Sequence, residues 1–120
     1  LINKLRVKVR IGKIYYLNKI ADSVHRDMLR IGWSDDRENQ NDVGIIEKYS
    51  NFVSQYHATL ERVDKNWVLR DGQWIANSGW RRSTNGTLVN GREIDAHTGY
   101  HLKVDDVITI GEVTLIVIAS

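Results

Sequence analysis

The feature that most constrains this sequence is its series of short apolar runs, each ended after a few residues by a turn signal. Residues 5–11, LRVKVRI, alternate apolar and charged side chains, which is the period-2 pattern of a strand with one buried face. Further strands are expected at 14–17, 27–32, 43–46, 57–63, 67–71, 87–89, 92–94, 107–110 and 114–118. Many short strands spaced by turns predict an all-β sandwich or barrel.

The stretch STNGTLVNG, residues 83–91, contains two Asn-Gly pairs. Asn-Gly between apolar runs favours a hairpin, because a type I′ turn needs positive φ at both central residues. Only three residues separate the pairs, which makes a very short strand between two hairpins. Elsewhere, residues 34–41 predict a polar loop, residues 72–82 predict an irregular Gly-rich segment, and residues 18–27 predict a helical turn or two.

Length and composition exclude several classes of protein. A chain of 120 residues is sufficient for one domain with a real hydrophobic core. The absence of cysteine excludes disulfides and thiolate metal sites. No apolar run approaches the roughly 20 residues of a membrane helix, so no membrane partner is expected. The chain starts at Leu1 without a visible signal peptide, and we expect it to be part of a longer protein.

The residue pattern also argues against catalysis and against nucleic-acid binding. Ser54 and His57 could suggest a nucleophile and a base, but no glycine elbow or third orienting group accompanies them. His97 and His101 lack the carboxylate or cysteine partners of a metal site, so neither metal nor cofactor is expected. The net charge of +2 is too mild to indicate nucleic acid by itself, and the basic N-terminal strand pattern is typical of a solvated face.

Several motifs occur in one order along the chain. A strand ends in Ile31-Gly32, and Ser54-x-x-His57, STNGTLVNG and LKVDDVITIG (102–111) follow. This order resembles the pattern of forkhead-associated (FHA) domains over residues 27–118, so residues 1–120 are expected to form a single FHA-like domain. The resemblance implies a β-sandwich of about eleven strands in two twisted, mostly antiparallel sheets. It also implies that loops at one end bind phosphothreonine peptides.

The resemblance assigns roles to individual residues. Ser54 is expected to donate its hydroxyl to the phosphate, with the backbone amide of Gln55 beside it and Thr84 donating from the facing loop. Asn85 is expected to bind the main chain of the peptide next to the phosphorylated residue. Four residues are expected to be architectural, namely Gly32, His57, Gly86 and Asn90.

The sequence departs from the family at its arginines. The arginine that follows the glycine of the first motif is replaced by Trp33, and the one that follows the motif serine is replaced by Gln55. Losing one charge-assisted hydrogen bond costs about 1.5–3 kcal/mol, which is roughly a 10- to 100-fold loss in affinity. We therefore expect another cation to substitute, and the candidates are Arg81 or Arg82 first, then Arg37, with Arg30 weaker. Trp33 or Trp80 would form an apolar wall.

Two readings of these loops stay open. In the first, the domain is a cytoplasmic, monomeric recognition module whose partner is a phosphothreonine-containing protein or peptide. In the second, it is a degenerate FHA domain that docks a partner without phosphate through the tryptophans of its loops, Trp33, Trp74 and Trp80. The alternative to a phosphate-binding role of Arg81 or Arg82 is that both are surface residues of a solvated loop.

Overall fold

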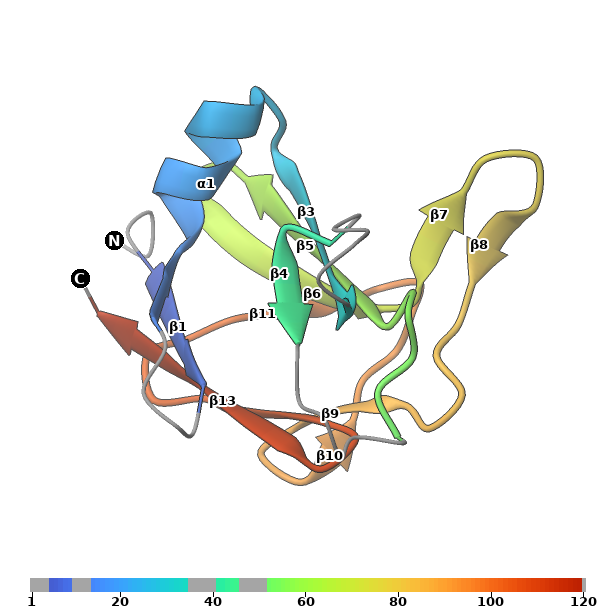
Figure 1. The fold of residues 1–120 in the computed structure, drawn as a ribbon. Coiled ribbons are helices and arrows are strands. Elements are labelled where there is room, and N and C mark those ends of the chain that lie inside the picture. The colour runs from blue at the N-terminus through green and yellow to red at the C-terminus, as the bar shows by residue number, and fades with distance from the viewer. Residues whose placement is uncertain (1–4, 10–13, 35–40, 46–51, 120) are drawn as a thin grey trace.

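The computed structural model describes residues 5–9, 14–34, 41–45 and 52–119, and these form two packed sheets (Figure 1). One sheet has six strands in the order β10-β9-β12-β13-β1-β2. Their bounds are β1 Leu5–Val9, β2 Ile14–Tyr16, β9 Thr87–Val89, β10 Arg92–Glu93, β12 Val107–Ile110 and β13 Val113–Ala119. All neighbouring strands in this sheet are antiparallel.

The second sheet has five strands in the order β11-β6-β5-β3-β4. Their bounds are β3 Met28–Trp33, β4 Val43–Ile45, β5 Ala58–Val63, β6 Asn66–Asp71 and β11 Tyr100–His101. The pair β3–β4 is parallel and the others are antiparallel. Within the described residues the two sheets together hold eleven strands, so the predicted mostly antiparallel β-sandwich is confirmed.

Alternating side chains of both sheets meet in one apolar core. Leu29, Ile31 and Leu60 point inward from the five-stranded sheet and are fully buried. Ile108 and Leu115, which face each other across β12 and β13, do the same from the six-stranded sheet. This packed core holds the loops at the ends of the strands in fixed positions.

A short helix, α1 (Leu17–Val24), follows β2 directly and confirms the predicted helical turns. It buries Leu17 and Ala21 against the core. His25 ends it in the left-handed conformation, at φ 54°, and its N–H donates to a carbonyl of the last turn. In Figure 1 the helix lies at the end of the sandwich away from the loops that carry the sequence motifs.

A third, two-stranded sheet corrects the prediction of an irregular segment at 72–82. The strands β7 (Gln73–Ile75) and β8 (Gly79–Arg81) pair antiparallel, with Trp74 opposite Trp80, and the hairpin projects from the sandwich (Figure 1). The prediction was wrong because the strands are only three residues long and their turn uses positive φ at Asn77 and Gly79. The turn Asn90-Gly91, with φ of 53° and 82°, joins β9 to β10 as predicted.

Candidate functional site

Two motif-bearing loops, one from each side of the sandwich, meet at one end (lower right in Figure 1). The described loop 52–57 leads into β5, and the loop 82–86 leads into β9. The backbone N–H of Thr84 donates to Ser54 Oγ at 3.1 Å. Asn85 Nδ2 donates to the carbonyl of Phe52 at 3.2 Å. The structure therefore brings Ser54, Thr84 and Asn85 together, although they are some 30 residues apart in sequence.

His57 is buried beneath the same two loops and forms a hydrogen bond to each of them. The Ser54 N–H donates to His57 Nδ1 at 3.0 Å, so that nitrogen is the acceptor. The other ring nitrogen, Nε2, then carries the proton and donates to the carbonyl of Gly86 at 2.9 Å. Burial lowers the pKa of His57 below its usual value, although the Gly86 carbonyl and the charge of Asp71 oppose this. A neutral imidazole therefore connects the loops.

A buried carboxylate shapes the second loop. Asp71, at the end of β6, accepts hydrogen bonds from the backbone and hydroxyl of Ser83 and from Thr87 Oγ1. Ser83 Oγ in turn accepts the N–H of Gly86 at 2.8 Å, which closes the turn that presents Thr84 and Asn85. Sequence reasoning missed this role of Asp71. The only signal was an acidic residue at the end of an apolar strand, where a charge needs donors.

The backbone carbonyl of Gln55 is held in place by close packing against Gly32 and by buried side-chain amides. A Cβ at Gly32 would lie 2.1 Å from the Gln55 carbonyl oxygen, so only glycine fits there. Asn41 Nδ2 donates to the same carbonyl at 2.9 Å, and Gln73 Nε2 donates to Asn41 Oδ1 at 2.9 Å. Asn41 and Gln73 are both buried and were not anticipated from the sequence. Their amides fix the loop that carries Ser54.

The arrangement offers hydrogen-bond donors to an anion. Ser54 Oγ accepts from Thr84, which leaves its own proton available to a ligand. Thr84 is exposed, and its hydroxyl is a second donor. Among the described residues, no carbonyl accepts the backbone N–H of Gln55. One acid stands close by, because a Cβ on Gly86 would lie 2.9 Å from Glu93 Oε1.

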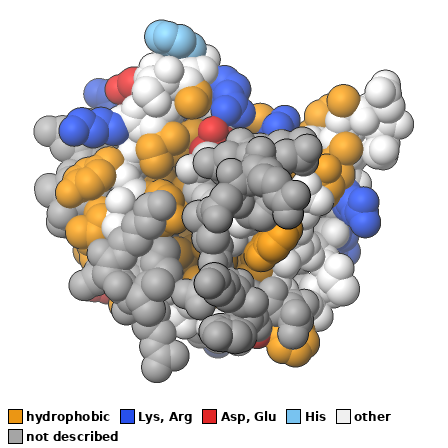
Figure 2. Space-filling view, in the orientation of Figure 1, with side chains coloured by type: hydrophobic (Ala, Val, Ile, Leu, Met, Phe, Trp, Pro, Cys, Tyr) orange, Lys and Arg blue, Asp and Glu red, His pale blue; other side chains and the backbone are white. Residues whose placement is uncertain are grey.

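The two candidate arginines differ in their surroundings. Arg81 and Arg82 are exposed at the base of the hairpin, where Figure 2 shows basic side chains, and neither forms an ion pair with another described residue. The N–H groups of His97 and Thr98 lower the pKa of Asp95, and the charge of Arg82 adds to this effect. Arg82 therefore lies close enough to Asp95 for their charges to interact, whereas no such interaction is found for Arg81 among the described residues. Arg37 lies outside the described residues.

Aromatic side chains surround the two loops. Trp33 and Trp80 are 37% and 38% exposed, and Trp80 Nε1 donates to the Asp71 carbonyl at 3.1 Å. Trp74, on the hairpin, is 60% exposed. Phe52 is 54% exposed beside Asn85 and was not singled out from the sequence, where it stands outside every motif. These side chains provide apolar contact area next to the polar loops.

Asn90 lies apart from the two loops and holds a turn. Its Nδ2 donates to Asp106 Oδ1 at 2.9 Å, and the Val107 N–H donates to its Oδ1 at 3.0 Å. These bonds fasten the β9–β10 turn to the start of β12. Asn90 thus bonds within the six-stranded sheet and not to the two motif loops.

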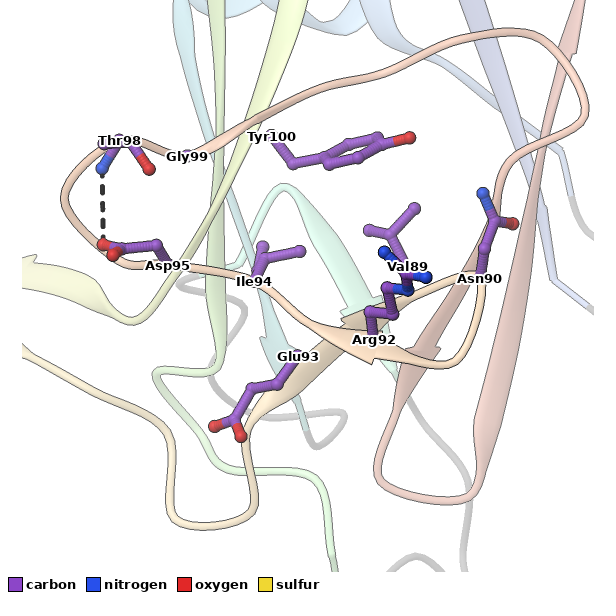
Figure 3. A pocket seen from close by; sticks show the side chains of 9 residues that line it. All are labelled: Val89, Asn90, Arg92, Glu93, Ile94, Asp95, Thr98, Gly99 and Tyr100. Atoms are coloured by element: carbon purple, nitrogen blue, oxygen red, sulfur yellow. Dashed lines mark hydrogen bonds between the residues drawn. The ribbon is translucent and has the colours of Figure 1, made fainter.

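A separate cavity of about 460 Å³ opens between β10 and the segment before β11 (Figure 3). Val89, Ile94 and the ring of Tyr100 form its apolar part, while the side chain of Glu93 turns away from the ring. Burial raises the pKa of Tyr100, and the nearby Asp106 adds to the shift. The described residues contain no cluster of metal-ligating side chains, and their helix is too short to cross a membrane.

Comparison with known proteins places these features in context. The family model of the FHA domain matches residues 29–111. The ABC transporter ATP-binding/permease protein Rv1747 of Mycobacterium tuberculosis is 34% identical over 104 residues, which are 87% of this chain and 10% of that protein. The chain therefore spans about a tenth of the length of this curated relative.

Two solved structures share the fold over nearly the whole chain. The FHA domain of an Arabidopsis thaliana hypothetical protein matches with a TM-score of 0.67 and 27% identity, covering 97% of this chain and 85% of that one. A structure from a study of phosphothreonine-dependent FHA domain interactions matches with a TM-score of 0.67 and 22% identity, covering 98% and 97%.

Proposed function

The chain belongs to the FHA domain family, whose members are phosphothreonine-binding interaction modules, and we propose that this domain binds a phosphothreonine-containing peptide of a partner protein. The observation that carries the proposal is the meeting of the Ser54 loop with the loop of Thr84 and Asn85. A phosphate carries nearly two negative charges and three acceptor oxygens, so it needs convergent donors and a cation.

The donors have distinct roles in this proposal. The hydroxyl of Ser54, the N–H of Gln55 and the hydroxyl of Thr84 bind the phosphate oxygens. Asn85 uses Nδ2 on the Phe52 carbonyl, which leaves Oδ1 free to accept an N–H of the peptide backbone. This contact fixes the position of the peptide without reading its side chains.

Arg81 is the cation that we propose in place of the missing arginine. It pairs across the hairpin with Gln73, so both residues lie on the same face of the hairpin. Gln73 reaches Asn41, which holds the Gln55 carbonyl, so this face is turned towards the Ser54 loop. Arg82 is the weaker candidate because its charge already interacts with that of Asp95.

Titration calorimetry with a degenerate phosphothreonine peptide pool, and with its unphosphorylated counterpart, tests the proposal. We expect binding that requires the phosphate and that Ser54→Ala weakens about 10-fold or more. The matched control is Ser23→Ala, because Ser23 is exposed and, among the described residues, its hydroxyl bonds only to the Ile20 carbonyl of α1. Equal binding of both pools would contradict the proposal.

The exposure of Trp33, Trp74 and Trp80 favours one second function, the docking of a partner without phosphate. In that case the tryptophans contribute contact area and the Ser54 loop is only structural. Binding that is equal for both peptide forms, and that is lost in Trp74→Ala but kept in Ser54→Ala, would select this alternative.

A further inference from the structure

The cavity of about 460 Å³ beside β10 lies where the edge strands of the two sheets meet, and we name it the edge pocket. The strand β10 is the outermost strand of the six-stranded sheet, and β11 is the outermost strand of the five-stranded sheet. Val89, Arg92 and Ile94 line the pocket from one side and Tyr100 lines it from the other. None of the lining residues belongs to the loops 52–57 and 82–86. The edge pocket is therefore a lateral opening between the sheets.

Arg92 occupies an inward-facing position of its sheet. It is the cross-strand partner of Val89, whose side chain is buried, so both side chains lie on the inner face. Tyr100 is paired in the same way with the fully buried Leu69, so its ring lies on the inner face of the opposite sheet. Figure 3 shows this ring above Val89 and Ile94, with Arg92 beside Val89. An aromatic ring thus faces an apolar surface that carries one guanidinium.

The guanidinium of Arg92 is the available charge of the edge pocket. It forms no ion pair with any described residue. Of the two acids that line the pocket, Glu93 turns away from the ring and lies close to Gly86, and Asp95 accepts two backbone N–H groups of the turn that follows it. Asp106, outside the lining, accepts a side-chain amide and a backbone N–H. The charges of the pocket therefore favour an anionic group beside Arg92.

The shape of the edge pocket suits a flat ring. Packed sheets lie about 10 Å apart, so a ring that enters between their edges can pack on Tyr100 with one face and on Ile94 with the other. Aromatic pairs gain more than their buried area alone provides, and a guanidinium also stacks on aromatic faces. A basic side chain would be repelled by Arg92. Because β10 is an edge strand, an approaching polypeptide can reach the opening.

We propose that the edge pocket binds an aromatic side chain of a partner protein, next to an aspartate or glutamate that pairs with Arg92. The ring of the partner packs between Tyr100 and Ile94, and its neighbouring carboxylate reaches the guanidinium. This inference goes beyond the proposed function, because the interaction requires neither a phosphate nor the Ser54 loop.

The test uses three dipeptides that are acetylated and amidated at their ends, namely Asp-Trp, Asn-Trp and Asp-Leu. Each is titrated into the isotope-labelled chain and followed by NMR. We expect Asp-Trp to shift the amide signals of residues 89–100 saturably, with a dissociation constant on the order of 1 mM. Asn-Trp should bind about threefold more weakly because it lacks the charge. Asp-Leu should bind about two- to tenfold more weakly because it cannot stack on Tyr100.

Two variants assign these differences to the edge pocket. Arg92→Gln should bind Asp-Trp and Asn-Trp equally. Lys103→Gln, which removes an exposed cation outside the lining, is the matched control and should keep the threefold difference. Tyr100→Leu should remove the preference for Asp-Trp over Asp-Leu, and thermal melting shows whether this variant is folded. If it is not, the comparison of Arg92→Gln with Lys103→Gln decides alone, because both side chains are exposed.

The outcomes are independent of the proposed function, since the dipeptides carry no phosphate. If no dipeptide shifts the pocket signals, or if the preference for Asp-Trp over Asn-Trp persists in Arg92→Gln, the inference is overturned. Arg92 then serves only as an inward-pointing charge that keeps other strands from pairing with β10. An excess of phosphothreonine peptide should leave Asp-Trp bound. Displacement of Asp-Trp would mean that the two sites are not separate, which also overturns the inference.

Discussion

The Nε2 atom of His57 lies 2.9 Å from the carbonyl oxygen of Gly86, and this contact joins loops that belong to different sheets. The same imidazole accepts the N–H of Ser54 at 3.0 Å. Because both ring nitrogens are used and the ring is fully buried, the side chain acts as a rigid link below the exposed donors. The neutral histidine therefore holds the two loops together from the buried side, in addition to the hydrogen bonds from Thr84 to Ser54 and from Asn85 to Phe52.

His57→Phe keeps an aromatic ring but leaves the Ser54 N–H and the Gly86 carbonyl without partners. We expect the free energy of unfolding to fall by about 2–4 kcal/mol, and phosphopeptide binding to weaken because the loops separate. Urea unfolding followed by fluorescence measures the first effect. His97→Phe, at an exposed histidine, is the control and should be nearly neutral. A His57→Phe domain as stable as the original would contradict the linking role.

The pKa of His57 makes stability depend on pH. Burial lowers this pKa below the usual 6.5. Below pH 6.5 the unfolded chain therefore binds a proton at His57 that the folded domain does not yet bind. The stabilisation is therefore complete above about 6.5 and declines as pH falls towards the lower folded-state pKa. We expect the melting temperature to drop through this window, and less so in His57→Gln. Identical pH profiles for the two proteins would exclude His57 as the cause.

The strands could be predicted from the sequence because their signals are local, whereas the meeting of the motif loops was implied only by the resemblance to the FHA family. Alternation identified the strands that bury one face, and Asn90-Gly91 identified a turn with two positive φ values. The β7–β8 hairpin could not be predicted, since three-residue strands carry too little periodicity. Its fold depends on contacts such as Trp80 with the Asp71 carbonyl.

The buried polar residues that support the site could not be predicted from the sequence for a different reason. Asn41, Asp71 and Gln73 function only through partners distant in sequence, such as Gln73 with Ile31 at a separation of 42 residues. Polar residues in loops or at strand ends usually face solvent, so nothing local marks them as buried. The order of motifs located the exposed donors, but the polar network that fixes them required the structure.

Gly32→Ala tests how tightly the Ser54 loop is packed on β3. The added methyl would lie 2.1 Å from the Gln55 carbonyl oxygen, so the loop must move. We expect destabilisation of about 1–3 kcal/mol or more and a loss of phosphopeptide binding. Gly91→Asn is the control, because nothing lies within 4 Å of a Cβ there and asparagine tolerates its positive φ. Equal thermal stability of the two variants would argue against tight packing at Gly32.

Lys65→Gly should stabilise the domain without affecting the site. Lys65 joins β5 to β6 with a φ of 71°, next to Asp64 at 47°, and a side chain at such a φ is strained. Glycine relieves the strain, and we expect a gain of about 1 kcal/mol in the free energy of unfolding. Chemical denaturation measures the gain, and calorimetry should show unchanged peptide affinity. An accompanying change in affinity would mean that global stability and binding are coupled.

The variants Arg81→Ala and Arg82→Ala should show which of the two arginines at the base of the hairpin binds the phosphate. Arg81 lies on the hairpin face of Gln73 and forms no ion pair within the described part of the chain, whereas the charge of Arg82 already acts on Asp95. Removing the cation that binds phosphate loses a charge-assisted hydrogen bond, so Arg81→Ala should weaken phosphopeptide binding about 10- to 100-fold. Arg82→Ala should weaken it by about threefold or less, because a solvated charge near an acid acts mainly through long-range attraction. Calorimetry at low and high salt distinguishes these cases, since only the long-range effect disappears at high salt.

If the double variant binds phosphothreonine peptide unchanged, neither arginine replaces the one that Trp33 displaced, and the phosphate must be held by other groups.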